Sequence, residues 1–169
     1  SAVMMEDQKR PRRCGHFEGK EILPKAEYLT KLSKVMATRS GLFVIARTDA
    51  TDPSEGIERA INYAEAGADA VMVEAIKDLE TIAKLRSFVS VPIMVNQLHG
   101  GKSPNWRFDE LEDAGASIVI CSTPCLFAAQ YGIERYHDQM LETNRLPSQS
   151  TATMEDCARV LNGQPGHVE

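Results

Sequence analysis

The chain has 169 residues, of which 43% are hydrophobic and 25% are charged, and its formal net charge is −5 at pH 7. These values describe an ordinary globular domain or part of a larger one. No apolar run approaches the roughly 20 residues that cross a bilayer, and the negative charge argues against binding to a phosphate backbone. Neither a membrane nor a nucleic acid is therefore expected as a partner.

The cysteines indicate a reducing compartment. Cys14, Cys121, Cys125 and Cys157 form no CxxC pair, and no secretory signal precedes them. We therefore expect free thiols and a cytoplasmic location. Cys121 and Cys125 are expected to be packing residues, whereas Cys14 follows a basic cluster at 9–13 that suits a small anionic ligand.

Five short apolar runs recur along the chain, and each is followed by polar residues. They cover 2–5, 42–46, 69–73, 91–95 and 117–120. An apolar run that ends in acids or amides is typical of a buried parallel strand whose carboxyl end opens onto a site. The first run begins at the second residue with no helix ahead of it, which we interpret as the middle of a longer protein.

Segments with apolar residues at helical spacing alternate with these runs. The predicted helices cover 24–36, 55–65, 78–88, 108–113 and 126–141, with a short further helix over 154–161. Ser54 is expected to cap the second of them. Phe88 is expected on the buried face of the helix that begins at Asp78.

The alternation of five strands with helices requires a parallel sheet covered by helices. An open doubly wound sheet would carry a glycine-rich phosphate turn after an early strand, and the sequence has none. We therefore predict an α/β protein with a (β/α)8 TIM-type barrel, here its C-terminal five βα units, with three units expected before Ser1. Residues 1–146 are assigned to this barrel portion and 147–169 to a C-terminal tail with a short helix.

The polar strand ends would meet at one rim of such a barrel. They carry Glu6, Arg47, Glu74 and Asn96, and the loop after the first strand adds Arg13, Cys14, Gly15 and His16. Acids beside an arginine and an amide suit a metal ion together with a multiply charged carboxylate. Plainer roles also fit: Arg47 as an ion-pair partner of Asp49 or Glu74, Glu6 and Glu74 as solvated loop acids, and 9–20 as a flexible lid.

Several of these segments together resemble one family. Glu6-Asp-Gln8, Arg13-Cys-Gly-His16, Ala46-Arg-Thr-Asp49, Val73-Glu-Ala75 and the strand end at Asn96 are similar, in order and spacing, to the isocitrate lyase and phosphoenolpyruvate mutase superfamily. The branch with a cysteine loop includes methylisocitrate lyase, dimethylmalate lyase and carboxyphosphonoenolpyruvate mutase. The resemblance implies a Mg²⁺-dependent barrel that makes or breaks a bond next to a pyruvate-like enolate.

The resemblance also implies a role for each matched residue. Cys14, Arg47 and Glu74 would be catalytic; Arg13, Gly15, His16 and Asn96 would bind substrate; and Glu6 would lie at the metal. The Cys14 thiol would protonate a departing carbanion. In this family the aspartates that bind the metal directly lie on strands before the Glu6 position. One departure is Arg12, which stands where the lyases usually have lysine and cannot release a proton at working pH.

The function predicted from this resemblance is a Mg²⁺-dependent carbon–carbon lyase. Its substrate would be a 2-hydroxy di- or tricarboxylate, cleaved through an enolate to a 2-oxo acid, and this stretch alone is expected to be inactive. Two alternatives stay open: a carboxyphosphonoenolpyruvate-type mutase or oxaloacetate-type decarboxylase of the same superfamily, and a non-catalytic barrel remnant that serves binding or assembly. The resemblance further implies a homo-oligomer, either a tetramer or a dimer.

Overall fold

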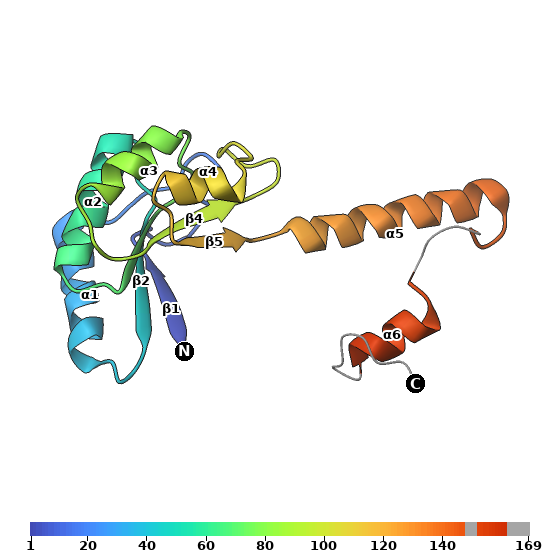
Figure 1. Ribbon diagram of the computed structural model, residues 1–169, viewed down its shortest axis with the longest axis horizontal. Coiled ribbons are helices and arrows are strands. Elements are labelled where there is room, and N and C mark those ends of the chain that lie inside the picture. The colour runs from blue at the N-terminus through green and yellow to red at the C-terminus, as the bar shows by residue number, and fades with distance from the viewer. Residues whose placement is uncertain (148–151, 162–169) are drawn as a thin grey trace. The chain divides into compact units, whose positions relative to one another are not determined.

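The computed structural model describes residues 1–147 and 152–161 as alternating strands and helices (Figure 1). Residue contacts divide the chain into two units, 1–124 and 125–169. The first unit carries the sheet and all the residues discussed below as a site. The division after residue 146 stays a prediction, and 148–151 and 162–169 of the predicted tail lie outside the described residues.

The first unit is built on a five-stranded parallel sheet. Its strands are β1 (Ala2–Glu6), β2 (Phe43–Thr48), β3 (Ala70–Val73), β4 (Ile93–Gln97) and β5 (Ile118–Cys121), paired in chain order. Because each strand pairs in parallel with the next one along the chain, the connections are βα crossovers that advance in one direction, as in a (β/α)8 barrel. The sheet is thus part of a TIM-type barrel, which confirms the predicted fold class.

The helices follow the predicted order. They are α1 (Lys25–Thr38), α2 (Pro53–Glu65), α3 (Leu79–Arg86), α4 (Phe108–Asp113), α5 (Pro124–Thr143) and α6 (Met154–Leu161). The bounds of α4 and α6 are those predicted. In the described part of the chain, no helix has both the length and the apolar character to span a membrane.

Two helix predictions were wrong. Asp52, not Ser54, caps α2, because its carboxylate accepts a hydrogen bond from the Glu55 N–H at 2.8 Å. Pro53 then occupies the first helical position, where its fixed φ and missing N–H are favourable. Phe88 is 61% exposed, because α3 ends at Arg86 and Phe88 no longer continues the face that buries Leu85.

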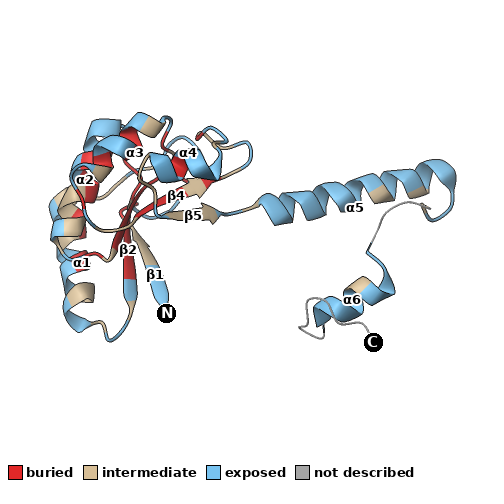
Figure 2. Cartoon of the chain, viewed as in Figure 1, coloured by how far each residue is buried: buried red, intermediate tan, exposed pale blue. Residues whose placement is uncertain are grey.

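The strands alternate between two buried faces, and Figure 2 shows that burial is greatest in β2 to β4. One face packs against the helices through a core that includes Val44, Ala46, Val71, Val73, Ile93, Val95, Tyr28, Leu32, Ile57 and Ile82. The opposite face carries a smaller cluster of Ile45, Ala70, Met72 and Met94. Since successive strand side chains point to opposite faces, this second cluster marks the face that a closed barrel turns inward.

All four cysteines are free thiols. The expected packing role of Cys121 and Cys125 was wrong, because both are exposed. Cys121 is the last residue of β5, which pairs on one side with β4 and is less buried than the central strands. Cys125 lies in the first turn of α5.

Candidate active site at the carboxyl ends of the strands

Side chains alternate between the two faces of each strand, and this alternation puts the polar residues at the carboxyl ends of the strands on the inward face. Each follows, two positions later, a residue of the inward face: Glu6 after Met4, Arg47 after Ile45, Glu74 after Met72, Asn96 after Met94 and Ser122 after Ile120. Parallel pairing aligns them further, because Glu6 lies opposite Arg47 and Asn96 opposite Ile120. The polar side chains therefore emerge from one face, just beyond the apolar inner layer.

Arg47 is the centre of the polar cluster. Its Nε and Nη2 donate to the two carboxylate oxygens of Asp49 at 2.9 and 2.8 Å, and its Nη1 lies 3.2 Å from Glu74 Oε2. Burial by itself lowers the pKa of the Arg47 guanidinium, but the hydrogen bonds to Asp49 and the charge of Glu74 outweigh burial and raise it. Arg47 is thus a fixed cation, held by both of the acids proposed as its ion-pair partners.

Glu74 is buried and faces several donors. The residue is 3% exposed, and its Oε1 lies 2.7 Å from His16 Nε2 and accepts a hydrogen bond from Asn96 Nδ2 at 3.1 Å. The Asn96 carbonyl in turn accepts a hydrogen bond from the Ser122 hydroxyl. The alternative of a solvated loop acid is therefore wrong for Glu74, whose position after a buried strand carries it into the cluster.

Glu6 lies at the edge of the cluster. Its side chain is 20% exposed, with Oε1 2.9 Å from Arg12 Nη1 and Oε2 3.9 Å from Arg47 Nε. A magnesium ion prefers a near-octahedral shell of oxygens, and Glu6 supplies two at most. Over residues 1–147 and 152–161, no group of three His, Cys, Asp or Glu side chains is arranged to hold a metal. The described residues alone therefore do not form a magnesium site.

The loop 9–20, for which a flexible lid stays a prediction, contacts the strand ends at several points. At its base, the Gln8 side-chain amide accepts from the Arg13 N–H at 2.9 Å and donates to the Arg13 carbonyl at 2.8 Å. Further along, Gly15 lies so close to the cluster that a Cβ would come within 2.2 Å of Glu74 Cγ and 2.7 Å of Arg47 Nη2. Glycine is required here because only a bare backbone fits.

The two remaining predicted residues lie on this loop but outside the ion-pair cluster. Cys14 is exposed, directly before Gly15, and its thiol is free. Arg13 is tied to Gln8 through its backbone, while its guanidinium lies beside Gly19. The structure thus brings Glu6, Gly15, His16, Arg47, Glu74 and Asn96 together, with Cys14 next to them and the Arg13 side chain directed along its own loop.

Lys20 is a site residue that the sequence analysis missed. Its side chain is 4% exposed, its Nζ donates to the Gly15 carbonyl at 2.5 Å, and it lies 3.6 Å from Asp49 Oδ1. Buried lysines are rare unless they are paired. Its place in a segment rich in charged residues hid it, since such segments are usually solvated.

Asp7 supports the site from the opposite face of β1. Its carboxylate accepts hydrogen bonds from the Thr48 hydroxyl at 2.7 Å, the Asp49 N–H at 2.9 Å and the Tyr63 hydroxyl at 2.8 Å, and lies 3.3 Å from Arg59 Nη1. Burial and then the charge of Asp7 raise the pKa of Tyr63. The sequence signal was the period of two, which turns Asp7 toward the helices when Glu6 faces inward.

A cavity of about 150 Å³ borders the cluster. Its lining includes Glu74, Ala75, Lys20, Lys77 and Lys102. Ala75 has a φ of 59°, a conformation that L-residues rarely adopt and that clusters at functional sites. Glu18 lines the cavity as well and is paired with Lys102, while Lys20 lies beside Asp49, so the cavity is a polar space in which three lysines face two carboxylates.

Comparison with known proteins agrees with this geometry. Residues 1–141 match the model of the family described as phosphoenolpyruvate phosphomutase. The chain is 38% identical over 146 residues to the 2-methylisocitrate lyase of Bacillus subtilis (strain 168), covering 84% of this chain and 48% of that protein. The chain therefore spans about half the length of this curated relative.

Solved structures show the same fold. The crystal structure of 2,3-dimethylmalate lyase superposes with a TM-score of 0.85 at 25% identity, over 96% of this chain and 57% of that one. The phosphonopyruvate hydrolase complex with oxalate and Mg²⁺, at 19% identity, superposes with a TM-score of 0.75 over 96% of this chain and 59% of that one. With most of its length matched by the family model, this chain belongs to the phosphoenolpyruvate phosphomutase family, within the isocitrate lyase superfamily.

Proposed function

We propose that the chain carries much of the active site of a carbon–carbon lyase that acts on a 2-hydroxy di- or tricarboxylate such as a methylisocitrate. The observation that supports this most directly is the approach of Gly15 to Arg47 and Glu74. It holds the Cys14 loop against a buried cation–carboxylate pair at the carboxyl ends of barrel strands, where barrel enzymes have their active sites. The similarity to 2-methylisocitrate lyase favours this substrate class.

Four residues have a direct part in the proposed reaction, and Glu74 and Asn96 would complete the shell around the substrate. Arg47 would attract and orient a substrate carboxylate, and the backbone N–H groups at Gly15 and His16 would contact an anionic oxygen. The hydroxyl proton would pass to water, and the Cα–Cβ bond would break with its electron pair staying on the departing carbon, which leaves a 2-oxo acid and a carbanion. The exposed Cys14 thiol would give its proton to that carbanion, and the resulting thiolate would regain a proton from water.

A magnesium requirement belongs to this proposal. The ion would stabilise the oxygens of the 2-oxo acid as a Lewis acid. Glu6 is the described carboxylate placed to lie near it, directly or through water, and the other ligands would have to come from outside the residues described here. The homo-oligomeric state, dimer or tetramer, and the cytoplasmic location stay predictions.

The test is a panel of 2-hydroxy and 2-oxo acids, assayed with Mg²⁺ on a protein that joins this chain to the barrel units carrying the other metal ligands, and on its Cys14→Ser variant. We expect turnover of a 2-hydroxy acid by the joined protein and none by residues 1–169 alone, because the described residues do not form a magnesium site. In Cys14→Ser, we expect a loss of about 10²- to 10⁴-fold, the usual contribution of a positioned proton donor, with ligand binding retained in calorimetry. Equal turnover in the two proteins would contradict the role of Cys14 and favour the decarboxylase alternative.

One observation favours the non-catalytic alternative. The Arg47 guanidinium is already bonded along one edge by Asp49 and approached by Glu74 on Nη1, which leaves little of it for a substrate. A binding or assembly module would bind carboxylates in calorimetry but give no turnover with either protein. The same panel therefore separates the two functions.

A further inference from the structure

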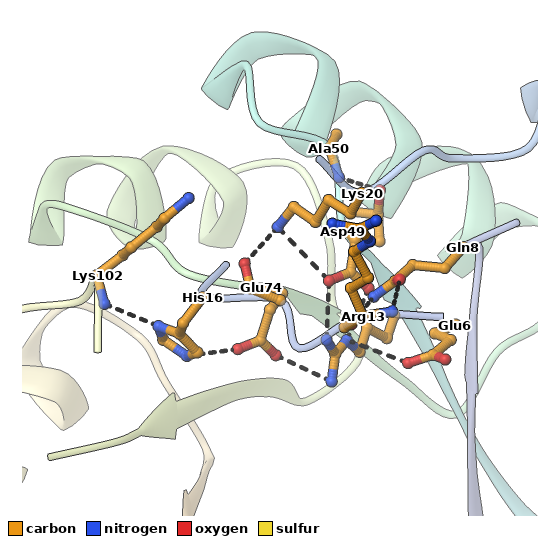
Figure 3. Close-up of polar contacts among 12 residues, drawn as sticks. Glu6, Gln8, Arg13, His16, Lys20, Asp49, Ala50, Glu74 and Lys102 are labelled. Atoms are coloured by element: carbon orange, nitrogen blue, oxygen red, sulfur yellow. Dashed lines mark hydrogen bonds and ion pairs between the residues drawn. The ribbon is translucent and has the colours of Figure 1, made fainter. Parts of the chain in front are cut away.

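His16 is held from two sides by residues far from it in the sequence. Its ring is buried, with a 3% exposed side chain. On one side, its Nδ1 accepts a hydrogen bond from the backbone N–H of Lys102 at 2.8 Å. On the other side, its Nε2 lies 2.7 Å from Glu74 Oε1 (Figure 3). The imidazole therefore bridges the β4–α4 loop and the buried carboxylate.

The loop is shaped to fit this ring. At Gly101, a Cβ would lie 2.7 Å from His16 Nδ1 and 2.9 Å from Cε1, so any side chain there would push the ring away. The Gly101 N–H donates to the Leu98 carbonyl at 3.0 Å, which closes the turn that presents Lys102. Next to it, the Lys102 side chain bonds Glu18 Oε1 at 2.6 Å and so ties the loop to the Cys14 loop.

These contacts fix where the ring proton lies. A nitrogen that accepts a hydrogen bond from a backbone N–H carries a lone pair, so a neutral ring has its proton on the other nitrogen. We propose that Gly101 and the Lys102 backbone hold His16 as its Nε2–H tautomer, with the proton directed toward Glu74. Gly101 and Lys102 are positioning residues in this proposal, because they act through His16.

The fixed proton has a consequence for the site. Nε2 is close to Glu74 but not aligned for a hydrogen bond, and it is a buried polar atom without a hydrogen-bond partner among the described residues. A buried polar atom without a hydrogen bond destabilises the folded state, and a partner that forms that hydrogen bond removes this cost. His16 therefore offers one N–H donor, at a known atom, to an anionic oxygen that enters beside Glu74. The opposite tautomer would present only a lone pair there and repel such an oxygen.

The His16 tautomer belongs to the proposed site, but it is measured in the absence of substrate, so its test is separate from the test of the proposed reaction. Two-dimensional ¹H–¹⁵N NMR of the imidazole rings distinguishes protonated from unprotonated nitrogens. The spectrum of the whole chain at neutral pH would be compared with that of His16→Gln, which identifies the His16 signals by their loss. The exposed His99 and His137 serve as internal references for rings that average between tautomers.

We expect His16 to show a protonated Nε2 and an unprotonated Nδ1, with no averaging. Lys102→Ala keeps the backbone donor and should leave this pattern unchanged, whereas Gly101→Ala should shift both nitrogens toward the averaged values of His99. Averaged signals or a protonated Nδ1 in the parent chain would overturn the proposal, and so would a Gly101→Ala variant with an unchanged pattern. Should Gly101→Ala fail to fold, the spectra of the parent chain and Lys102→Ala decide the question.

Discussion

Gly15→Ala tests the close approach on which the candidate site depends. The new Cβ would lie 2.2 Å from Glu74 Cγ and 2.7 Å from both Arg47 Nη2 and Asp49 Oδ1. Carbon atoms in contact are normally about 3.5–4.0 Å apart, so the loop or the Glu74 side chain must move by roughly 1 Å or more. Neither moves freely, because the three contacted residues form one ion-pair network.

Forced overpacking of this kind lowers the free energy of unfolding by about 1–3 kcal/mol, and we expect a loss in the upper half of that range. Urea unfolding followed by the fluorescence of Trp106, the single tryptophan and a residue of the first unit, gives the free energy of unfolding. If the loop instead detaches, trypsin should cleave faster within residues 9–13, which are rich in lysine and arginine.

Gly132→Ala is the matched control. Gly132 lies inside α5 with nothing within 4 Å of its Cβ position, so alanine should stabilise the helix by roughly 0.5–1 kcal/mol, measured by circular dichroism. The same substitution is therefore expected to have opposite signs at the two positions. A Gly15→Ala protein within about 0.5 kcal/mol of the parent, with unchanged trypsin sensitivity, would refute the tight approach; that margin is typical of inert surface changes.

Two further predictions concern charged groups. Asp7→Ala should cost about 3–5 kcal/mol in urea unfolding, because it leaves buried Arg59 with only Glu55 as a carboxylate partner and removes the acceptor of three buried donors, the Thr48 and Tyr63 hydroxyls and the Asp49 N–H. The exposed Asp113→Ala should change stability by less than about 0.5 kcal/mol, and similar losses in the two would contradict the reasoning. The hydrogen bond from Lys102 holds the pKa of Glu18 below its ordinary 4.5. The stabilisation from this pair is therefore present above pH 4.5 and is lost as the pH falls through the lower folded-state value. NMR titration of the Glu18 carboxyl should show its midpoint move back toward 4.5 in Lys102→Ala, and an unchanged midpoint would contradict the assignment.

Much of the site was predictable because strand side chains alternate strictly. Once Met72 and Met94 are placed on the inner face, Glu74 and Asn96 two residues later must follow on the same face at the strand ends. The alternation does not predict how deeply each of these side chains is buried. Glu6 and Glu74 occupy equivalent positions, yet one is partly exposed and the other buried. Gly15 and His16 of the Cys14 loop pack against Glu74, whereas Glu6 lies on the edge strand β1 and meets only the exposed Arg12 of that loop.

The errors arose where a residue's environment is set by the end of an element or by a distant segment. Phe88 fits the apolar spacing of α3 but lies beyond its last turn, and Cys121 ends β5, which is less buried than its neighbour β4. Lys20 looked like a solvated loop residue until its Nζ was found on the Gly15 carbonyl. Local pattern says nothing about which loop folds back over which side chain.

The sequence by itself determined the order of strands and helices, the parallel sheet and the face on which the polar strand ends lie. Those features depend on short-range periodicity and on the rule that parallel strands need crossover connections. Only the tertiary structure decided that His16 meets Lys102 across 86 residues and that Asp7 meets Arg59 across 52. Such contacts depend on how complete elements pack together, and packing is a property of the assembled fold, not of any single segment.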